Sequence, residues 1–186
     1  MAAFTLKMER LDSDKKVERS KAVGAARRKK GVKAHELVQK VKDDALKSLQ
    51  QQIKSNPSGY EKLMTQVLVE SITKLNEVNI TVECLPRDAQ LVTKLLPTAL
   101  EAYKQTVKAQ HKEDPIKYET QLATSAKCSI QLDSSRPLSE KSYIGGVKCV
   151  GLNGRIVCDN TLNTRLALAT EALLPTIRGS LFPQLA

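Results

Sequence analysis

Four cysteines are the side chains of this sequence best suited to metal or covalent chemistry. They are Cys84, Cys128, Cys149 and Cys158, and no two of them form a C-x-x-C pair or another zinc-like spacing. Each falls in a segment that we interpret as a strand, at an apolar position of the alternation. We therefore predict buried free thiols in a reducing cytosol, with neither a metal site nor a disulfide.

The histidines and carboxylates do not form a catalytic pattern either. His35 and His111 are far apart, and neither has a cysteine or an acid at ligand spacing, so neither is predicted to bind metal or act as a base. The pairs Asp43-Asp44 and Glu113-Asp114 are typical of solvated charge. No phosphate-binding G-x-x-x-x-G-K-[ST] loop and no G-x-S-x-G elbow occurs. The sequence predicts a protein that is not an enzyme and holds no cofactor.

Positive charge is concentrated near the N-terminus. Residues 1–55 hold 15 Lys/Arg against 7 Asp/Glu, whereas residues 56–186 hold 15 against 13. The run Arg27-Arg28-Lys29-Lys30 fits a patch for nucleic acid or anionic lipid, or else a solvated helix face. No aromatic residues are interleaved there to stack on bases. The alternative function is a nucleic-acid-binding α+β module that uses residues 15–33 as a basic arm.

The elements along the chain begin with an N-terminal extension, residues 1–55. In residues 1–33, Gly24 and Gly31 are predicted to interrupt any helix. Residues 34–54 follow a helical period, and their narrow apolar stripe indicates either a partner helix in a coiled coil or docking on the chain's own core. The predicted partner-helix positions are Val38, Val41, Ala45, Leu49 and Ile53.

A break is predicted at Asn56-Pro57, with Pro57 at the first position of the next helix. Ser58 and Glu61 fit a capping box one turn later. The helix that follows has a broad apolar face and should therefore pack on the core. That face comprises Tyr60, Leu63, Met64, Val67, Leu68, Ser71, Ile72 and Leu75.

The central part of the chain alternates strands with helices. Residues 78–84 and 125–133 alternate as half-buried strands. A helix capped by Asp88 runs between them, and Pro97 predicts a kink there or two helices that meet. Residues 111–124 are polar and are predicted to form a loop.

The last part, residues 145–182, combines a hairpin with an amphipathic helix. Val147 and Cys149 alternate, as do Ile156 and Cys158, and Asn153-Gly154 between the two runs suits a tight turn. Asp159 and Asn160 are predicted to cap the helix. Its apolar stripe is Leu162, Leu166, Ala169, Leu173 and Ile177. Together the elements predict an α+β fold: a helical, coiled-coil-type extension, then a small domain over residues 56–186 with a four-stranded mixed sheet packed by helices.

The same stretch resembles the C-terminal end of the E subunit of the V-type proton ATPase. The residues that carry the resemblance mix glycines, arginines and a proline at fixed offsets. They are Gly145, Gly146, Val147, Gly154, Ile156, Asn160, Thr161, Leu162, Arg165, Leu166, Pro175, Ile177, Arg178, Leu181 and Phe182. The similarity continues more loosely back to about residue 34.

The resemblance implies a non-catalytic stator subunit. Such a protein pairs with the G subunit in a peripheral stalk, contacts the non-catalytic nucleotide-site subunit and other stator subunits, and holds the headpiece against rotation during ATP-driven proton pumping. It would lie on the cytosolic face of acidic-compartment membranes, reach the membrane only through the complex, and bind no nucleic acid. The resemblance also implies a longer N-terminal helix than these residues provide.

Two arginines of the motif leave two interpretations open. Arg165 and Arg178 either reach a partner subunit as forked donors or bond to acids and carbonyls within the fold, Asp159 being one candidate. Gly145, Gly154, Asn160 and Pro175 are predicted to be turn and cap residues.

Overall fold

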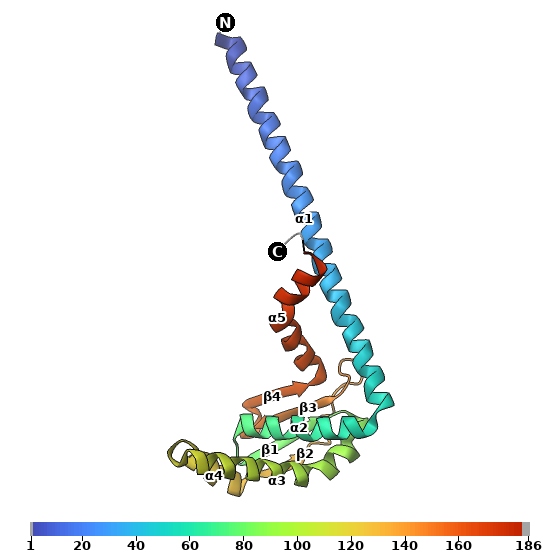
Figure 1. The fold of residues 1–186 in the computed structure, drawn as a ribbon, viewed down its shortest axis with the longest axis vertical. Coiled ribbons are helices and arrows are strands. Elements are labelled where there is room, and N and C mark those ends of the chain that lie inside the picture. Colours follow the sequence, from blue (N-terminus) through green and yellow to red (C-terminus); the bar gives the residue numbers. More distant parts are fainter. Residues whose placement is uncertain (1, 184–186) are drawn as a thin grey trace. The chain divides into compact units, whose positions relative to one another are not determined.

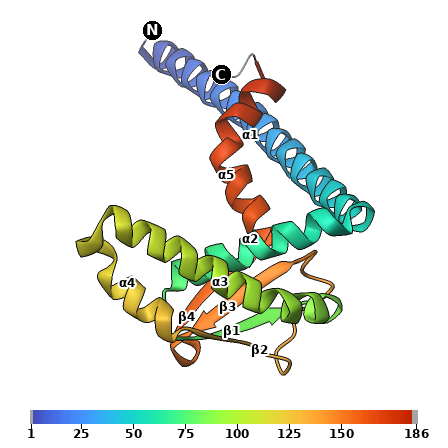
Figure 2. The same ribbon diagram turned by 60° about the horizontal axis from the view of Figure 1, so that its bottom comes forward.

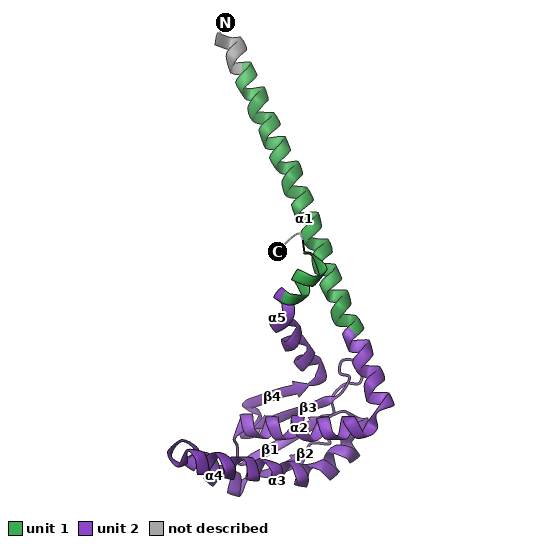
Figure 3. Ribbon diagram, in the orientation of Figure 1, with its two compact units in different colours: residues 1–44, 176–186 green, residues 45–175 purple. Residues whose placement is uncertain are grey.

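A computed structural model describes residues 2–183, and the side chains from residue 7 onward. The chain divides into two compact units (Figure 3). One combines residues 1–44 with 176–186, and the other, which we call the head, is residues 45–175. The two long terminal helices, α1 (Ala2–Ser55) and α5 (Leu162–Leu181), each contribute residues to both units.

Helix α1 is a single helix (Figure 1). The prediction that Gly24 and Gly31 interrupt it was therefore wrong. A glycine in a helix interior costs only about 1 kcal/mol relative to alanine. The residues around the two glycines are mostly alanine, lysine and arginine, which are strong helix formers, so the helix continues through both positions.

The predicted break after α1 is present. Pro57 is the first residue of α2 (Pro57–Leu75), as expected. The capping box of Ser58 and Glu61 was wrong, because Asn56 is the cap: its Oδ1 accepts a hydrogen bond of 2.9 Å from the backbone N–H of Gly59. An asparagine in that position satisfies one of the free N–H groups of the first turn.

The head contains the predicted four-stranded mixed sheet. Its strands are β1 (Asn79–Cys84), β2 (Ser129–Leu132), β3 (Gly146–Gly151) and β4 (Ile156–Thr161), in the order β2-β1-β3-β4. Strands β1 and β2 are parallel, and the other two pairs are antiparallel. The expected α+β class is confirmed.

Helices cover one face of this sheet (Figure 2). Helix α2 packs on β3 and β4, and α3 (Ala89–Glu113) packs on α2 and β2. The side chains between them form the core, and the predicted core face of α2 is buried except for Leu63, which is partly exposed. Fully buried members of the core include Met64, Val67, Leu68, Ile72, Val82, Val92, Tyr103, Val147 and Cys149.

Residues 111–124 were predicted to be a loop, and this was wrong. Helix α3 continues to Glu113, and α4 (Pro115–Lys127) follows it and packs on α3. Asp114 caps α4 by accepting a 3.2 Å hydrogen bond from the N–H of Lys117. Because α4 ends at Lys127, the following strand β2 is shorter than predicted. Helix α3 also runs unbroken through Pro97, so no second helix begins there.

In the β3–β4 hairpin turn, Asn153 and Gly154 have positive φ, at 54° and 93°, as the sequence predicts. Leu152 also has a positive φ, of 50°, which the sequence did not predict. The predicted cap of α5 was wrong, because Asp159 accepts from the N–H of Thr161, before the helix begins, and Asn160 donates to α2. Thr161 caps the helix, since its Oγ1 accepts from the backbone N–H of Thr164 at 3.4 Å.

Candidate interaction surfaces and the polar braces of the head

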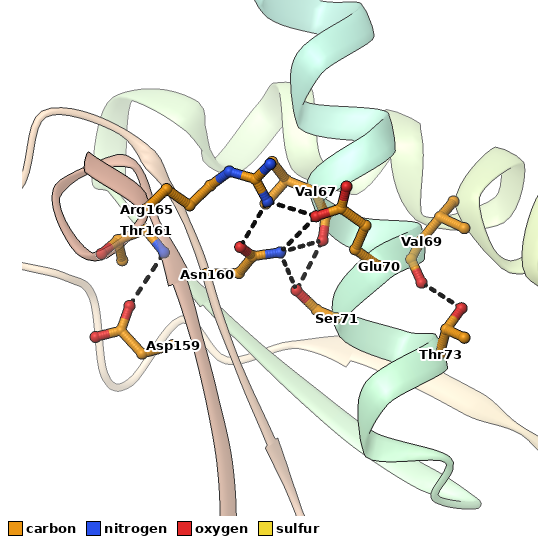
Figure 4. Close-up of polar contacts among 9 residues, drawn as sticks. All are labelled: Val67, Val69, Glu70, Ser71, Thr73, Asp159, Asn160, Thr161 and Arg165. Carbon is orange, nitrogen blue, oxygen red and sulfur yellow. Dashed lines mark hydrogen bonds and ion pairs between the residues drawn. The ribbon is translucent and has the colours of Figure 1, made fainter. Parts of the chain in front are cut away.

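Asn160 is the centre of a buried polar cluster that joins β4 to α2 (Figure 4). Its side chain is 6% exposed, and its amide nitrogen donates to the carbonyl of Val67 at 3.0 Å and to the hydroxyl of Ser71 at 3.1 Å. Its amide oxygen accepts from Arg165 at 3.0 Å. A buried amide with donors and acceptors all bonded fixes the distance and the register between strand and helix.

Arg165 completes the cluster by bonding to Glu70. This hydrogen bond, followed by the attraction of the guanidinium charge, lowers the pKa of Glu70. Arg165 therefore bonds to an acid within the fold, which is one of its two predicted roles, but this acid is Glu70 and not Asp159. Asp159 instead accepts a hydrogen bond from the backbone N–H of Thr161 at 3.0 Å. Sequence reasoning missed Glu70, which lies on the predicted core helix but gives no local signal of its partner.

Neighbouring atoms lie so close to Gly145, just before β3, and to Gly146, its first residue, that neither position has room for a side chain. A Cβ on Gly145 would lie 2.6 Å from the hydroxyl of Tyr60, and one on Gly146 would lie 2.7 Å from the Cα of Thr161. Gly146 also has a φ of 91°, which disfavours other residues. The carbonyl of Gly145 accepts from the N–H of Leu162 at 3.0 Å, which ties the start of β3 to the start of α5.

A second polar brace lies around Asp88, which is buried. The hydroxyl of Tyr60 donates to its carboxylate at 2.7 Å, and burial followed by this hydrogen bond raises the pKa of the phenol. Neighbouring Arg87 donates to the carbonyl of Ile144. Asn163 of α5 accepts from the N–H of Ile144 at 2.9 Å. The side chain of Asp88, the predicted cap residue, thus bonds to Tyr60 in the core and makes no cap hydrogen bond to α3.

The predicted partner-helix positions on α1 are not equivalent. Leu49 and Ile53 pack against the core of the head and line a hollow of about 400 Å³ with Tyr60, Leu63 and Leu162. Ala45 is half-buried. Val38 is 5% exposed, within the unit that combines residues 1–44 with 176–186.

Val41, by contrast, is 41% exposed, as is the neighbouring Leu37 at 44%. Further toward the N-terminus, α1 exposes Met8, Leu11, Val17, Val23 and Val32. An apolar side chain that the chain itself leaves in water is available to a partner. The surface formed by Leu37 and Val41 is the candidate helix-pairing site.

Helix α5 is buried only at its start. Leu162 is in the core and Leu166 is half-buried, but Leu173 is 54% exposed and Ala169 is also exposed. The predicted stripe is therefore not a buried face along its whole length. The motif residues Pro175, Arg178 and Leu181 are exposed and Phe182 is half-buried. Arg178 makes no side-chain hydrogen bond or ion pair within the described part of the chain, unlike Arg165.

The four cysteines lie in or next to the four strands of the head. All four cysteines are free, and three are buried while Cys158 is partly exposed. Burial raises the pKa of Cys84 to about 11 and that of Cys149 to about 12, so both thiols stay protonated at neutral pH. Within the described residues, no group of His, Cys, Asp or Glu is placed to hold a metal ion.

A long helix with exposed apolar side chains, joined to a small α+β domain whose polar clusters brace its elements, is the architecture of a component of a larger assembly. The chain belongs to the family of the ATP synthase (E/31 kDa) subunit, whose model matches residues 1–182.

Its relatives are components of one proton pump. The V-type proton ATPase E subunit of Drosophila melanogaster is 32% identical over 98% of this chain and 72% of its own length. The E1 subunit of the Arabidopsis thaliana pump is 30% identical over 97% of this chain and 75% of its own. The Manduca sexta E subunit is 28% identical over 98% and 72%. Between residues 2 and 183, the structure contains no helix that is both long enough and apolar enough to cross a bilayer.

Proposed function

We propose that the chain is a non-catalytic peripheral-stalk subunit of a V-type proton ATPase, which holds the ATP-hydrolysing headpiece against rotation. One observation carries the proposal: residues 2–44 of α1 belong to a compact unit separate from the head and expose Leu37 and Val41. At 1.5 Å per residue, this part of the helix is about 65 Å long. Such a helix is suited to pair side by side with another.

In this proposal the partner along α1 is the G subunit. The head contacts the non-catalytic nucleotide-site subunit of the headpiece and other stator subunits, and Leu173 is its candidate contact on α5. Arg178 and Leu181, which are exposed near the end of α5 and belong to the other unit, are further candidate contacts. The chain lies on the cytosolic face of acidic-compartment membranes and is attached through the complex. Its own role is mechanical, and it turns over no substrate.

The test is a double substitution, Leu37→Asp with Val41→Asp, in the full chain co-expressed with the G subunit. Both side chains are exposed and outside the head, so the head should fold normally while the pairing surface gains two charges. We expect capture of the G subunit to fall by about tenfold or more, since charges at the centre of a helix interface remain unpaired when buried.

The matched control is Ile116→Asp on α4, where the side chain is 92% exposed. This variant should capture the G subunit just as the unchanged chain does. Leu49 is unsuitable for the test because it packs against the core of the head. Undiminished capture by the double variant would contradict pairing through this surface.

A further inference from the structure

The net positive charge of α1 is concentrated in one stretch. Residues 15–33 contain nine Lys/Arg and one Asp/Glu, whereas residues 34–55 contain four and three. All nine basic side chains are exposed, on an unbroken helix. We call residues 15–33 the basic segment. Because Gly24 and Gly31 do not break the helix, these charges have fixed relative positions.

Within the basic segment, like charges repeat at helical neighbour spacing. Lys15 and Arg19 are four residues apart, as are Lys29 and Lys33. Such pairs repel one another on a helix surface. Lys33 has an acidic partner at 2.7 Å, Glu36, which lies just beyond the segment. The charge also opposes parallel, in-register pairing of two copies of this chain, because basic side chains of one copy would lie opposite basic side chains of the other.

A heptad repeat can be traced through the segment. From Val41, steps of three and four residues pass Val38, which the chain itself buries. They then lead back through six positions: Ala34, Gly31, Arg27, Gly24, Ser20 and Val17. Most of these side chains are small. A Cβ on Gly31 would meet nothing within 4 Å, and one on Gly24 would meet only Arg28. The chain's own packing thus does not require either glycine.

The positions that flank this seam are the ones that select partners in coiled coils. Here they are Lys16, Lys21, Arg28 and Lys30, with Val23 and His35. None of the six is acidic. With small residues in the seam and cations beside it, recognition at this level depends on charge more than on apolar burial.

We propose that the basic segment pairs with an acidic helix of another subunit, whose carboxylates face Lys16, Lys21, Arg28 and Lys30. This inference rests on the proposed stalk function and specifies the chemistry of the partner. It places a salt-sensitive contact next to the apolar contact at Leu37 and Val41. The two would be separable by ionic strength, because exposed ion pairs are screened and apolar contacts are not.

Two other anionic partners fit the observations less well. A bilayer surface requires bulky apolar side chains on one face of the helix, and the segment offers only three valines. Nucleic-acid phosphates would match the charge, but the segment has no aromatic residue to stack on bases, and phosphate binding makes no use of the small-residue seam.

The experiment is zero-length carbodiimide cross-linking of the assembled ATPase purified through the tagged full chain, followed by peptide mapping. This reagent joins a lysine amine directly to a carboxylate. We expect Lys16, Lys21 and Lys30 to be joined to Asp or Glu residues that recur at helical spacing in one other subunit. If these lysines form no such links, although a lysine-to-lysine reagent links them to a neighbour, the inference is overturned.

A pair of variants provides an independent readout. Lys21→Glu with Lys30→Glu should lower incorporation into the complex by about tenfold or more, because like charges then face each other. Lys108→Glu with Lys112→Glu, which makes the same charge change at exposed positions of α3, should leave incorporation unchanged. If the two variants are incorporated equally well, the proposed pairing of the basic segment with an acidic helix is refuted.

The remaining outcomes separate this inference from the stalk function itself. If the unchanged chain does not enter the ATPase, the proposed function fails first. If it enters, and Lys21→Glu with Lys30→Glu instead abolishes binding to a single-stranded RNA oligonucleotide or to phosphatidylserine vesicles while incorporation is unchanged, the basic segment serves that ligand and the acidic helix is excluded.

Discussion

Replacing Asn160 with alanine should destabilise the head by about 3 kcal/mol. Besides a long contact of 3.5 Å with Glu70, the substitution removes three hydrogen bonds: those donated to Val67 and Ser71 and the one accepted from Arg165. Each is worth about 1 kcal/mol net. The cost should not be larger, because no partner is left alone: Ser71 still donates to the Val67 carbonyl at 2.7 Å, and Arg165 still bonds to Glu70.

Tyrosine fluorescence can measure this in the full chain without interference from the helical unit. The sequence has four tyrosines and no tryptophan, and all four tyrosines, Tyr60, Tyr103, Tyr118 and Tyr143, lie within the head. Urea titration followed by this signal therefore reports unfolding of residues 45–175. The midpoint should fall at a nearly constant slope, which would indicate a change of stability and not of the exposed surface.

Two arginine substitutions serve as controls. Arg165→Ala removes the partner of a half-exposed carboxylate, so it should cost about 1 kcal/mol and should be non-additive with Asn160→Ala. Arg178→Ala, at an exposed position, should cost almost nothing. If Asn160→Ala changed stability no more than Arg178→Ala does, the cluster would not brace strand against helix, and our reasoning would be refuted.

Three further predictions concern single positions in the head. Gly146→Ala should cost about 2 kcal/mol or more, because the new Cβ would collide with the backbone of β4; Gly154→Ala, with a φ of 93° but nothing within 4 Å, should cost less in the same urea titration. Leu162→Ala should cost about 2–5 kcal/mol as a core truncation, whereas Leu173→Ala at an exposed position should cost under about 1 kcal/mol; equal values would contradict the burial described for α5. The lowered pKa of Glu70 stabilises the fold above the ordinary carboxyl pKa, and this contribution is lost as pH falls through the lower folded value. Stability curves between neutral and acidic pH should therefore be flatter for Glu70→Gln than for the unchanged chain, and parallel curves would count against the ion pair.

The strands were predictable because their signals are local. The alternation of Val147 and Cys149 and the Asn153-Gly154 turn lie within a few residues of one another, and the hairpin forms where they indicate. The Asn56-Pro57 break is equally local. Only the choice of cap was missed there, since several polar residues near a helix start can bond to its free N–H groups.

Helix α4 was missed because its polar sequence was interpreted as a loop. Its stability depends on packing against α3, and Ile116 in its first turn is 92% exposed. The pair Asp114-Pro115 was the available signal, a cap residue followed by a proline suited to the first helical turn. In α5 the apolar period was predicted correctly. The spacing of apolar residues does not show, however, how much of the helix other elements of the fold will bury.

The polar clusters around Asn160 and Asp88 could not be predicted from local sequence patterns. Asn160 and Ser71 are 89 residues apart in sequence and meet only because β4 packs under α2. Asn160 was interpreted as a cap, since asparagine before a helix usually is one. The apolar stripe of α1 likewise did not decide which of its positions the rest of the chain covers. Leu49 packs against the core of the head, whereas Leu37 is exposed.

The strand order has a consequence for how the head is made. Only residues 152–155 connect β3 to β4, whereas residues 85–128 connect β1 to β2. The β1–β2 pair therefore cannot form until this long connection is in place. Closing a short loop costs less entropy than closing a long one, so the hairpin can form quickly and independently. During synthesis, β1 keeps one open edge until the hairpin has left the ribosome, and α1 emerges complete long before that. A nascent chain stalled before residue 146 would display an unpaired strand edge, a recognised hazard for aggregation.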